Sequence, residues 1–169
     1  QGRKIALAHG VFDVFHIGHL KHLEVAKQNA DILIVSITSD RYVRKGPSRP
    51  YFSENIRAEF LSSIEIVDFI VINDDVTSIN LINTIKPDIY VKGKDYQNPS
   101  KDITGNISLE KKAVKKNGGK ILITEEIEFS SSKIINEFIQ PPKIMDSLKD
   151  IEKIRNGCID AVNSLKNLK

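Results

Sequence analysis

The chain has 169 residues, of which 40% are hydrophobic and 28% charged, and its formal net charge is +3 at pH 7. This composition is typical of a soluble globular protein, and so small a net charge does not indicate a nucleic acid or a membrane surface as a partner. The single cysteine, Cys158, excludes an internal disulfide, and no apolar run approaches the ~20 residues that span a bilayer. We therefore expect a cytoplasmic protein with no nucleic-acid or membrane partner.

Apolar, strand-like segments alternate along the chain with amphipathic, helix-like segments. Strands are expected at residues 4–9, 32–37, 69–72, 89–91 and 121–124, and helices at about 18–29, after Ser53, from Ser78 to Pro87 and from Ser108 to Gly118. This alternation predicts an α/β fold, and we expect a Rossmann-like doubly wound parallel sheet of five strands in the order 3-2-1-4-5. In such a sheet a ligand lies beyond the carboxyl ends of the strands where the strand order reverses, here between the first and fourth strands.

The turn between the first strand and the first helix carries two histidines around a glycine. It reads Gly10-Val11-Phe12-Asp13-Val14-Phe15-His16-Ile17-Gly18-His19. Free backbone N–H groups and the helix dipole favour an anion at a helix N-terminus, an imidazole can donate to a phosphate oxygen, and a glycine allows close backbone approach. The turn therefore predicts a site for a nucleoside triphosphate.

Basic and hydroxyl-bearing residues follow other strands at the same expected edge of the sheet. The loop of residues 39–52 carries Arg41, Arg44, Lys45 and Arg49, and we expect it to fold over the crevice as a lid, with Lys45 on the phosphates. Lys92 and Gly93 come after the fourth strand, and Asp95 follows in a polar loop. Ser130, Ser131 and Ser132 come after the fifth strand, where hydroxyl and N–H groups at the start of a helix suit a phosphate.

The turn resembles the H-x-G-H signature of the cytidylyltransferase-like nucleotidyltransferases, and the match extends through Gly10, Phe12 and Asp13. Further matching segments are Ser39-Asp40, Ser48-Arg49-Pro50, Val91-Lys92-Gly93-Lys94-Asp95-Tyr96 and Ser130-Ser131-Ser132-Lys133-Ile134-Ile135. The pattern is most similar to the heptose-phosphate adenylyltransferase domain, and next to glycerol-3-phosphate cytidylyltransferase. The arginine of the R-T-E-G-I-S-T signature is missing, which leaves ATP and CTP both open as the nucleotide.

The resemblance implies an enzyme that joins a nucleoside triphosphate, with its Mg²⁺, to a phosphorylated sugar or polyol and releases pyrophosphate. A heptose 1-phosphate is the first acceptor to expect, and glycerol 3-phosphate the alternative. Predicted catalytic residues are His16, His19, Lys45 and Lys92. Predicted nucleotide-binding residues are Gly10, Val11, Phe12, Asp13, Gly18, Asp40, Arg57, Gly93, Asp95, Ser130, Ser131 and Ser132. No residue is predicted to bind a metal ion.

Other interpretations of these residues stay open. His16-Ile17-Gly18-His19 is also the signature of class I aminoacyl-tRNA synthetases, but the chain has no K-M-S-K-S counterpart and is too short for a complete synthetase. His16, His19 and His22 have the spacing of a zinc site, although the turn should separate them. A non-catalytic nucleotide-binding domain is a third alternative. Two single residues also have non-functional alternatives. Lys92 can be the last residue of a strand with its side chain in water, and Arg57 can be a surface arginine beside Glu54 or Glu59.

The chain beyond Pro141-Pro142 has the pattern of an amphipathic helix. Its apolar residues recur every three or four positions, at Leu148, Ile151, Ile154, Cys158, Ala161, Leu165 and Leu168. We expect a nucleotidyltransferase domain at residues 1–140 and this helix at residues 141–169. The helix either packs on the same domain, which is the simpler interpretation, or forms a homodimer contact or a linker to a further domain.

Overall fold

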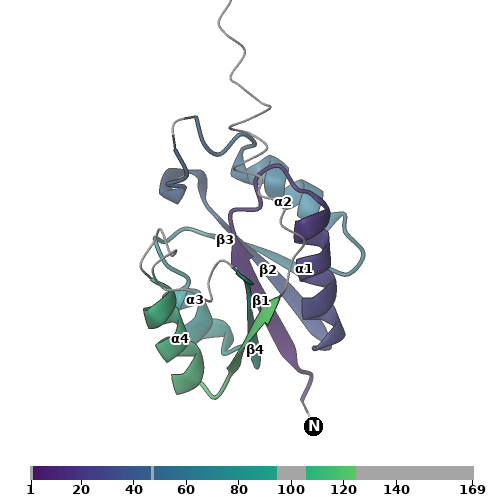
Figure 1. Cartoon of the computed structure of the whole chain (residues 1–169), viewed down its shortest axis with the longest axis vertical. Coiled ribbons are helices and arrows are strands. Elements are labelled where there is room, and N and C mark those ends of the chain that lie inside the picture. Colours follow the sequence, from purple (N-terminus) through teal and green to yellow (C-terminus); the bar gives the residue numbers. More distant parts are fainter. Residues whose placement is uncertain (1, 47, 95–105, 125–169) are drawn as a thin grey trace, which may run out of the picture. The chain divides into compact units, whose positions relative to one another are not determined.

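The computed structural model describes residues 2–46, 48–94 and 106–124 (Figure 1). All of them belong to the first of the two units into which the chain divides, Gln1–Ser131. The predicted domain boundary at residue 140, the amphipathic helix and the homodimer contact lie outside the described residues and stay predictions. No helix within the described residues is long and apolar enough to cross a membrane.

Five parallel strands form one sheet in the order β3-β2-β1-β4-β5, which confirms the predicted fold. The strands are β1 (Ile5–Gly10), β2 (Ile32–Thr38), β3 (Phe69–Asn73), β4 (Ile89–Gly93) and β5 (Lys120–Thr124). At the centre, Ala8 of β1 pairs with Val35 of β2 on one side and with Val91 of β4 on the other. The order reverses at β1, so the carboxyl ends of β1 and β4 flank the crevice where ligands of such folds bind.

Helices cover both faces of the sheet. They are α1 (Ile17–Gln28), α2 (Glu54–Ser62), α3 (Ile79–Ile85) and α4 (Ile107–Lys116), and a short 3₁₀ helix, η1 (Asp40–Tyr42), follows β2. Figure 1 shows α1 and α2 on one side of the sheet and α3 and α4 on the other. This arrangement is the doubly wound architecture that the alternating sequence predicts.

The side chains of β1 alternate between two apolar cores. Ala6 and Ala8 are fully buried in the core that contains Leu23 of α1. Leu7 points to the opposite face and packs in the core with Ile82 of α3 and Val114 of α4. Since successive side chains of a strand point to opposite faces, the apolar run at the start of the chain is what a central strand buried on both sides needs.

Element boundaries follow local signals, and two of the differences from the expectations bear on the site. Gly118 has φ +81° just after α4, as expected for a glycine that ends a helix. Ser53 stands at the N-cap of α2 but makes no side-chain capping bond. Instead, Glu54 and Asp40 each accept a hydrogen bond from the other's backbone N–H, at 2.7 and 3.1 Å. The second difference is in β4, which continues through Lys92 and Gly93 rather than ending at Val91.

Candidate functional site

The two histidines of the turn stack on each other at the start of α1. Their ring centroids are 3.9 Å apart and the rings are inclined by 21°. His16 is the N-cap residue, and its Nδ1 accepts a hydrogen bond from the backbone N–H of Gly18 at 3.1 Å. A neutral imidazole that accepts at Nδ1 carries its proton on Nε2. The cap therefore fixes the tautomer in which Nε2 of His16 is a donor.

His19 is held between aromatic rings. The Phe12 ring meets the His19 ring edge-on, with ring centroids 5.3 Å apart. The Phe15 ring is tilted against the His19 ring, with ring centroids 5.4 Å apart. Phe12 has φ +50°, and a Cβ at Gly10 would lie only 3.2 Å from the Phe12 ring. Gly10 therefore makes room for Phe12, and Phe12 in turn orients His19.

The turn is a region of positive potential. Burial, with added effects from the charges of His16, Lys45 and His22, lowers the pKa of His19 to about 3. His19 is therefore neutral at physiological pH, and its Nδ1 is buried with no hydrogen-bond partner among the described residues. An anion placed here would be attracted by the positive charge of Lys45.

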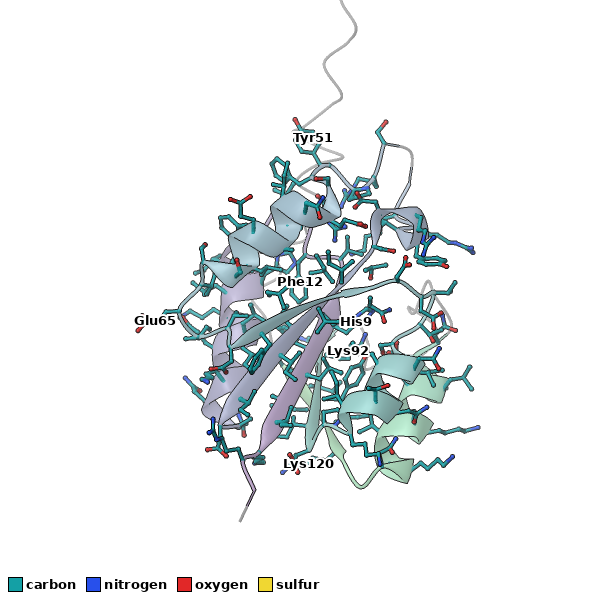
Figure 2. All side chains as sticks on the ribbon, turned by 180° about the vertical axis from the view of Figure 1, so that it is seen from behind. His9, Phe12, Tyr51, Glu65, Lys92 and Lys120 are labelled. Atoms are coloured by element: carbon teal, nitrogen blue, oxygen red, sulfur yellow. The ribbon has the colours of Figure 1, made fainter. Side chains whose placement is uncertain are left out.

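The basic loop after β2 lies against this turn, as the lid prediction requires. The carboxylate of Asp13 accepts hydrogen bonds from the backbone N–H groups of Tyr51 and Phe52, at 2.8 and 3.0 Å. It also pairs with Arg49, whose Nε lies 2.9 Å from Oδ2. Lys45 is exposed, and its positive charge contributes to the lowered pKa of His19. In Figure 2, Tyr51 stands above Phe12 at the end of the sheet where His9 and Lys92 also lie, and Lys120 lies at the other end.

Arg57 holds three segments of the site together. It is 2% exposed, so the alternative of a surface arginine is wrong. Its guanidinium donates to the carbonyl oxygens of Val11 (2.6 Å), Thr38 (2.9 Å) and Phe52 (3.0 Å) and to the carboxylate of Asp40 (2.6 Å). Val11, Asp40 and Arg57 thus support the walls of the site. Their direct contact with a nucleotide stays a prediction.

Lys92 is buried rather than directed into water. It is 4% exposed, and its Nζ lies 3.3 Å from Oε2 of Glu110 and 3.5 Å from the carbonyl oxygen of His9. Because β4 continues through Gly93, Lys92 points to the same face as Tyr90, toward α4, where Glu110 meets it. The alternative in which Lys92 ends a strand in water is therefore wrong, and a contact of Lys92 with phosphate stays a prediction.

A buried polar cluster around Glu110 was not predicted from the sequence. The Glu110 carboxylate accepts from Ser78 Oγ at 2.8 Å and from Tyr90 Oη at 2.9 Å. Burial alone would raise the pKa of Glu110, but Lys92, His9 and these two hydrogen bonds hold it below its ordinary value. The helical position of Glu110 could have revealed it. Glu110 lies three residues from Ile107 and three from Ala113, so all three residues share the buried face of α4.

His9 completes this cluster at the end of β1. Its Nδ1 lies 3.0 Å from Ser36 Oγ of β2. Burial and the neighbouring Lys92 ammonium lower the pKa of His9 to about 3. Two histidines are thus held neutral near the point where the strand order reverses: His9 in β1 and His19 in α1.

The structure brings together most, but not all, of the predicted site. Gly10, Phe12, Asp13, His16, Gly18 and His19 form one turn, and Gly93 ends the neighbouring strand β4. Asp95, Ser130, Ser131 and Ser132 lie outside the described residues, so their roles stay predictions. Within the described part of the chain, no group of three or more histidine, cysteine or acidic side chains is placed to hold a metal ion. The third histidine of the zinc interpretation, His22, has its Nδ1 2.7 Å from Oγ1 of Thr124 in β5.

Comparison with known proteins identifies the family. The model of the family described as cytidylyltransferase-like matches residues 7–137, which include the whole turn, most of β1 and all of the other four strands. The chain belongs to the cytidylyltransferase-like family. It therefore contains a domain of that family, and the matched residues include the histidine turn.

Two of the curated relatives that this chain matches are both named bifunctional protein HldE. The protein from Syntrophotalea carbinolica is 36% identical over 141 residues, which are 82% of this chain and 27% of the relative. The protein from Campylobacter jejuni subsp. doylei is 44% identical over 142 residues, 81% of this chain and 28% of the relative. The chain thus spans about a quarter of the length of these relatives.

A solved structure shares the same fold. The crystal structure of the lipopolysaccharide core biosynthesis protein from Thermoplasma volcanium GSS1 superposes with a TM-score of 0.60 at 26% sequence identity. The match covers 76% of this chain and 100% of that one. This agreement supports the Rossmann-like α/β fold of the described residues.

Proposed function

We propose that this protein transfers a nucleotidyl group from a nucleoside triphosphate to a sugar phosphate and releases pyrophosphate, with ATP and a heptose 1-phosphate as its substrates. The observation that carries this proposal is the stacked pair of His16 and His19 at the N-terminus of α1, next to the carboxyl end of β4. The names of the relatives, HldE and a lipopolysaccharide core biosynthesis protein, support a place in polysaccharide biosynthesis.

The proposed reaction is an in-line displacement. A phosphate oxygen of the acceptor attacks the α-phosphorus of the nucleotide and forms the new P–O bond. The bond from the α-phosphorus to the bridging oxygen breaks, and pyrophosphate leaves with that electron pair. No covalent enzyme intermediate is needed, so the protein contributes positioning and stabilisation of the charge that develops on the phosphate oxygens.

The turn suits this task through its donors. His16 accepts from Gly18 at Nδ1, which leaves Nε2 as the donor to a phosphate oxygen. His19 is neutral because its pKa is lowered to about 3, so a buried donor is present at neutral pH without the desolvation cost of a buried charge. Lys45, an exposed residue of the loop after β2, supplies a positive charge for the departing pyrophosphate.

We propose that Mg²⁺ enters with the nucleotide. Asp13 is the one acidic residue in the turn, and its carboxylate is already used by Arg49 and two backbone N–H groups. Mg²⁺ prefers oxygen ligands and commonly bridges phosphate oxygens while keeping several waters. The described residues therefore fit an ion held by the triphosphate better than an ion held by the protein.

The test compares His16→Ala with His16→Asn. Both remove the imidazole, but asparagine can still accept the Gly18 hydrogen bond at the N-cap. We expect both variants to lose ~10²–10³-fold in the rate of pyrophosphate release, and only the alanine variant to lose helix stability. Near-normal turnover by His16→Asn would refute the proposed role of the turn.

Calorimetric titration of MgATP and MgCTP separates the remaining candidates. Binding of ATP alone supports the adenylyltransferase, and binding of CTP alone indicates a cytidylyltransferase with an acceptor such as glycerol 3-phosphate. Tight nucleotide binding without pyrophosphate release, across heptose 1-phosphate and glycerol 3-phosphate, would indicate a non-catalytic nucleotide-binding domain.

A further inference from the structure

The guanidinium of Arg49 is buried without a full set of partners. Its side chain is 3% exposed. None of its three nitrogens makes a hydrogen bond with the described residues, although Nε lies 2.9 Å from Asp13 Oδ2 as an ion pair. A guanidinium has five N–H donors in a fixed fork, so most of the hydrogen-bonding capacity of Arg49 is unused.

The unpaired donors concentrate at one place in the fold. Among the described residues, the buried side-chain nitrogens without a hydrogen-bond partner belong to His19 and Arg49. The two residues are linked through the turn after β1: Arg49 pairs with Asp13, and the neighbouring Phe12 contacts the His19 ring. A buried donor left unpaired is unfavourable, and such groups in a native protein commonly mark a missing ion, water or ligand.

A role for Arg49 as a loop anchor does not account for these donors. Asp13 already anchors this loop through the backbone N–H groups of Tyr51 and Phe52. The ion pair with Asp13 is formed through Nε, and Nη1 and Nη2 make no hydrogen bond with the described residues. Two adjacent N–H donors in one plane match the spacing of two oxygens on a phosphate, which is the anion that arginine binds bidentately.

We propose that Arg49 binds a substrate phosphate group through Nη1 and Nη2, while Asp13 holds its Nε in place. This assignment deepens the proposed function and rests on it. Arg49 would supply the planar, bidentate donor that the imidazoles of the turn lack. The phosphate belongs either to the nucleotide or to the acceptor, because both substrates carry this group.

The experiment measures anion affinity directly and needs no turnover. Inorganic pyrophosphate, inorganic phosphate, MgATP and MgCTP are titrated by calorimetry into wild type, Arg49→Gln and Arg49→Lys. The lysine variant keeps a positive charge beside Asp13 but loses the fork, so it tests the geometry if the glutamine variant folds poorly. Arg44→Gln is the matched control, because Arg44 is an exposed arginine of the same loop. Urea unfolding of each variant records stability separately.

We expect Arg49→Gln to bind its phosphate ligand ~10–100-fold more weakly than wild type, Arg49→Lys to fall between them, and Arg44→Gln to stay close to wild type. Weaker binding of nucleotide or pyrophosphate assigns Arg49 to the nucleotide. Unchanged nucleotide affinity with a similar increase in KM for heptose 1-phosphate assigns it to the acceptor.

Two results would overturn the assignment. If both Arg49 variants bind every anion and use the acceptor as wild type does, and differ only in stability, Arg49 is a loop anchor and the proposed function still stands. If wild type binds none of the four anions and releases no pyrophosphate, the assignment and the proposed function both fail.

Discussion

The buried ion pair between Lys92 and Glu110 offers a sharp test of how this site is built. Both side chains are almost fully enclosed, with 4% and 6% exposure, so solvent does not screen the pair. Glu110→Gln would keep the size of the side chain and an oxygen for Ser78 and Tyr90, but would leave a buried ammonium without its counter-charge. Removal of one partner of a buried pair costs ~3–5 kcal/mol in the free energy of unfolding.

The assay is urea unfolding followed by circular dichroism. With a urea dependence of ~1–3 kcal/mol per M for a domain of this size, the midpoint should fall by ~1–5 M in Glu110→Gln. Lys92→Met should lose a comparable amount at neutral pH. Its deficit should shrink on acidification, because without Lys92 the buried Glu110 has a raised pKa and is more stable when protonated.

The double variant Lys92→Met/Glu110→Gln separates structure from chemistry. Replacement of both charges by uncharged side chains of similar volume is often neutral or stabilising, so we expect the double variant to recover most of the stability that either single variant loses. If it is stable and inactive, Lys92 acts on the phosphates as the sequence predicts; if it is stable and active, Lys92 only supports the fold. Losses below ~1 kcal/mol in both single variants would refute the reasoning.

His9 and His19 have pKa values lowered to about 3 from 6.5, so only the unfolded chain takes up protons on them between these values. We expect the free energy of unfolding to be greatest above about pH 6.5 and to fall as the pH drops toward 3, measured by urea unfolding across that range. Arg57→Lys should cost ~2–4 kcal/mol, because a lysine cannot reach the four acceptors that the guanidinium serves, and thermal unfolding would show it. Gly119→Ala should cost ~1–3 kcal/mol, since its Cβ would lie 2.2 Å from the carbonyl oxygen of Pro87.

Matched controls make these effects specific. A His9→Asn variant should have a shallower pH dependence than wild type, and equal slopes would contradict the assignment of His9 as a buried neutral group. Arg41→Lys, on an exposed arginine, is the control for Arg57→Lys, and Gly2→Ala is the control for Gly119→Ala because nothing lies within 4 Å of a Cβ at Gly2. Stability losses as large in the controls as in the test variants would argue against the stated contacts.

The sequence was sufficient to predict the α/β fold, and it places the residues of the histidine turn close together. Apolar strands alternating with amphipathic helices allow few arrangements, because parallel strands need crossover helices that cover both faces. The histidine turn is also a local feature: Gly10, His16, Gly18 and His19 lie within one strand-to-helix connection, so their proximity follows from chain continuity. A strand-to-helix turn at the reversal point of the sheet then predicts an anion site without further knowledge of the packing.

Only the tertiary structure decided which charged residues are buried and what they contact. From the sequence alone, three cationic residues would be expected in solvent: Lys92, Arg49 and Arg57. In the structure each pairs with an acidic side chain from a distant segment, Lys92 with Glu110, Arg49 with Asp13 and Arg57 with Asp40. The direction of Lys92 depends on β4 continuing by two residues, and its partner depends on which face of α4 packs on the sheet. Such pairings arise from burial and charge compensation between remote parts of the chain, and local sequence patterns do not encode them.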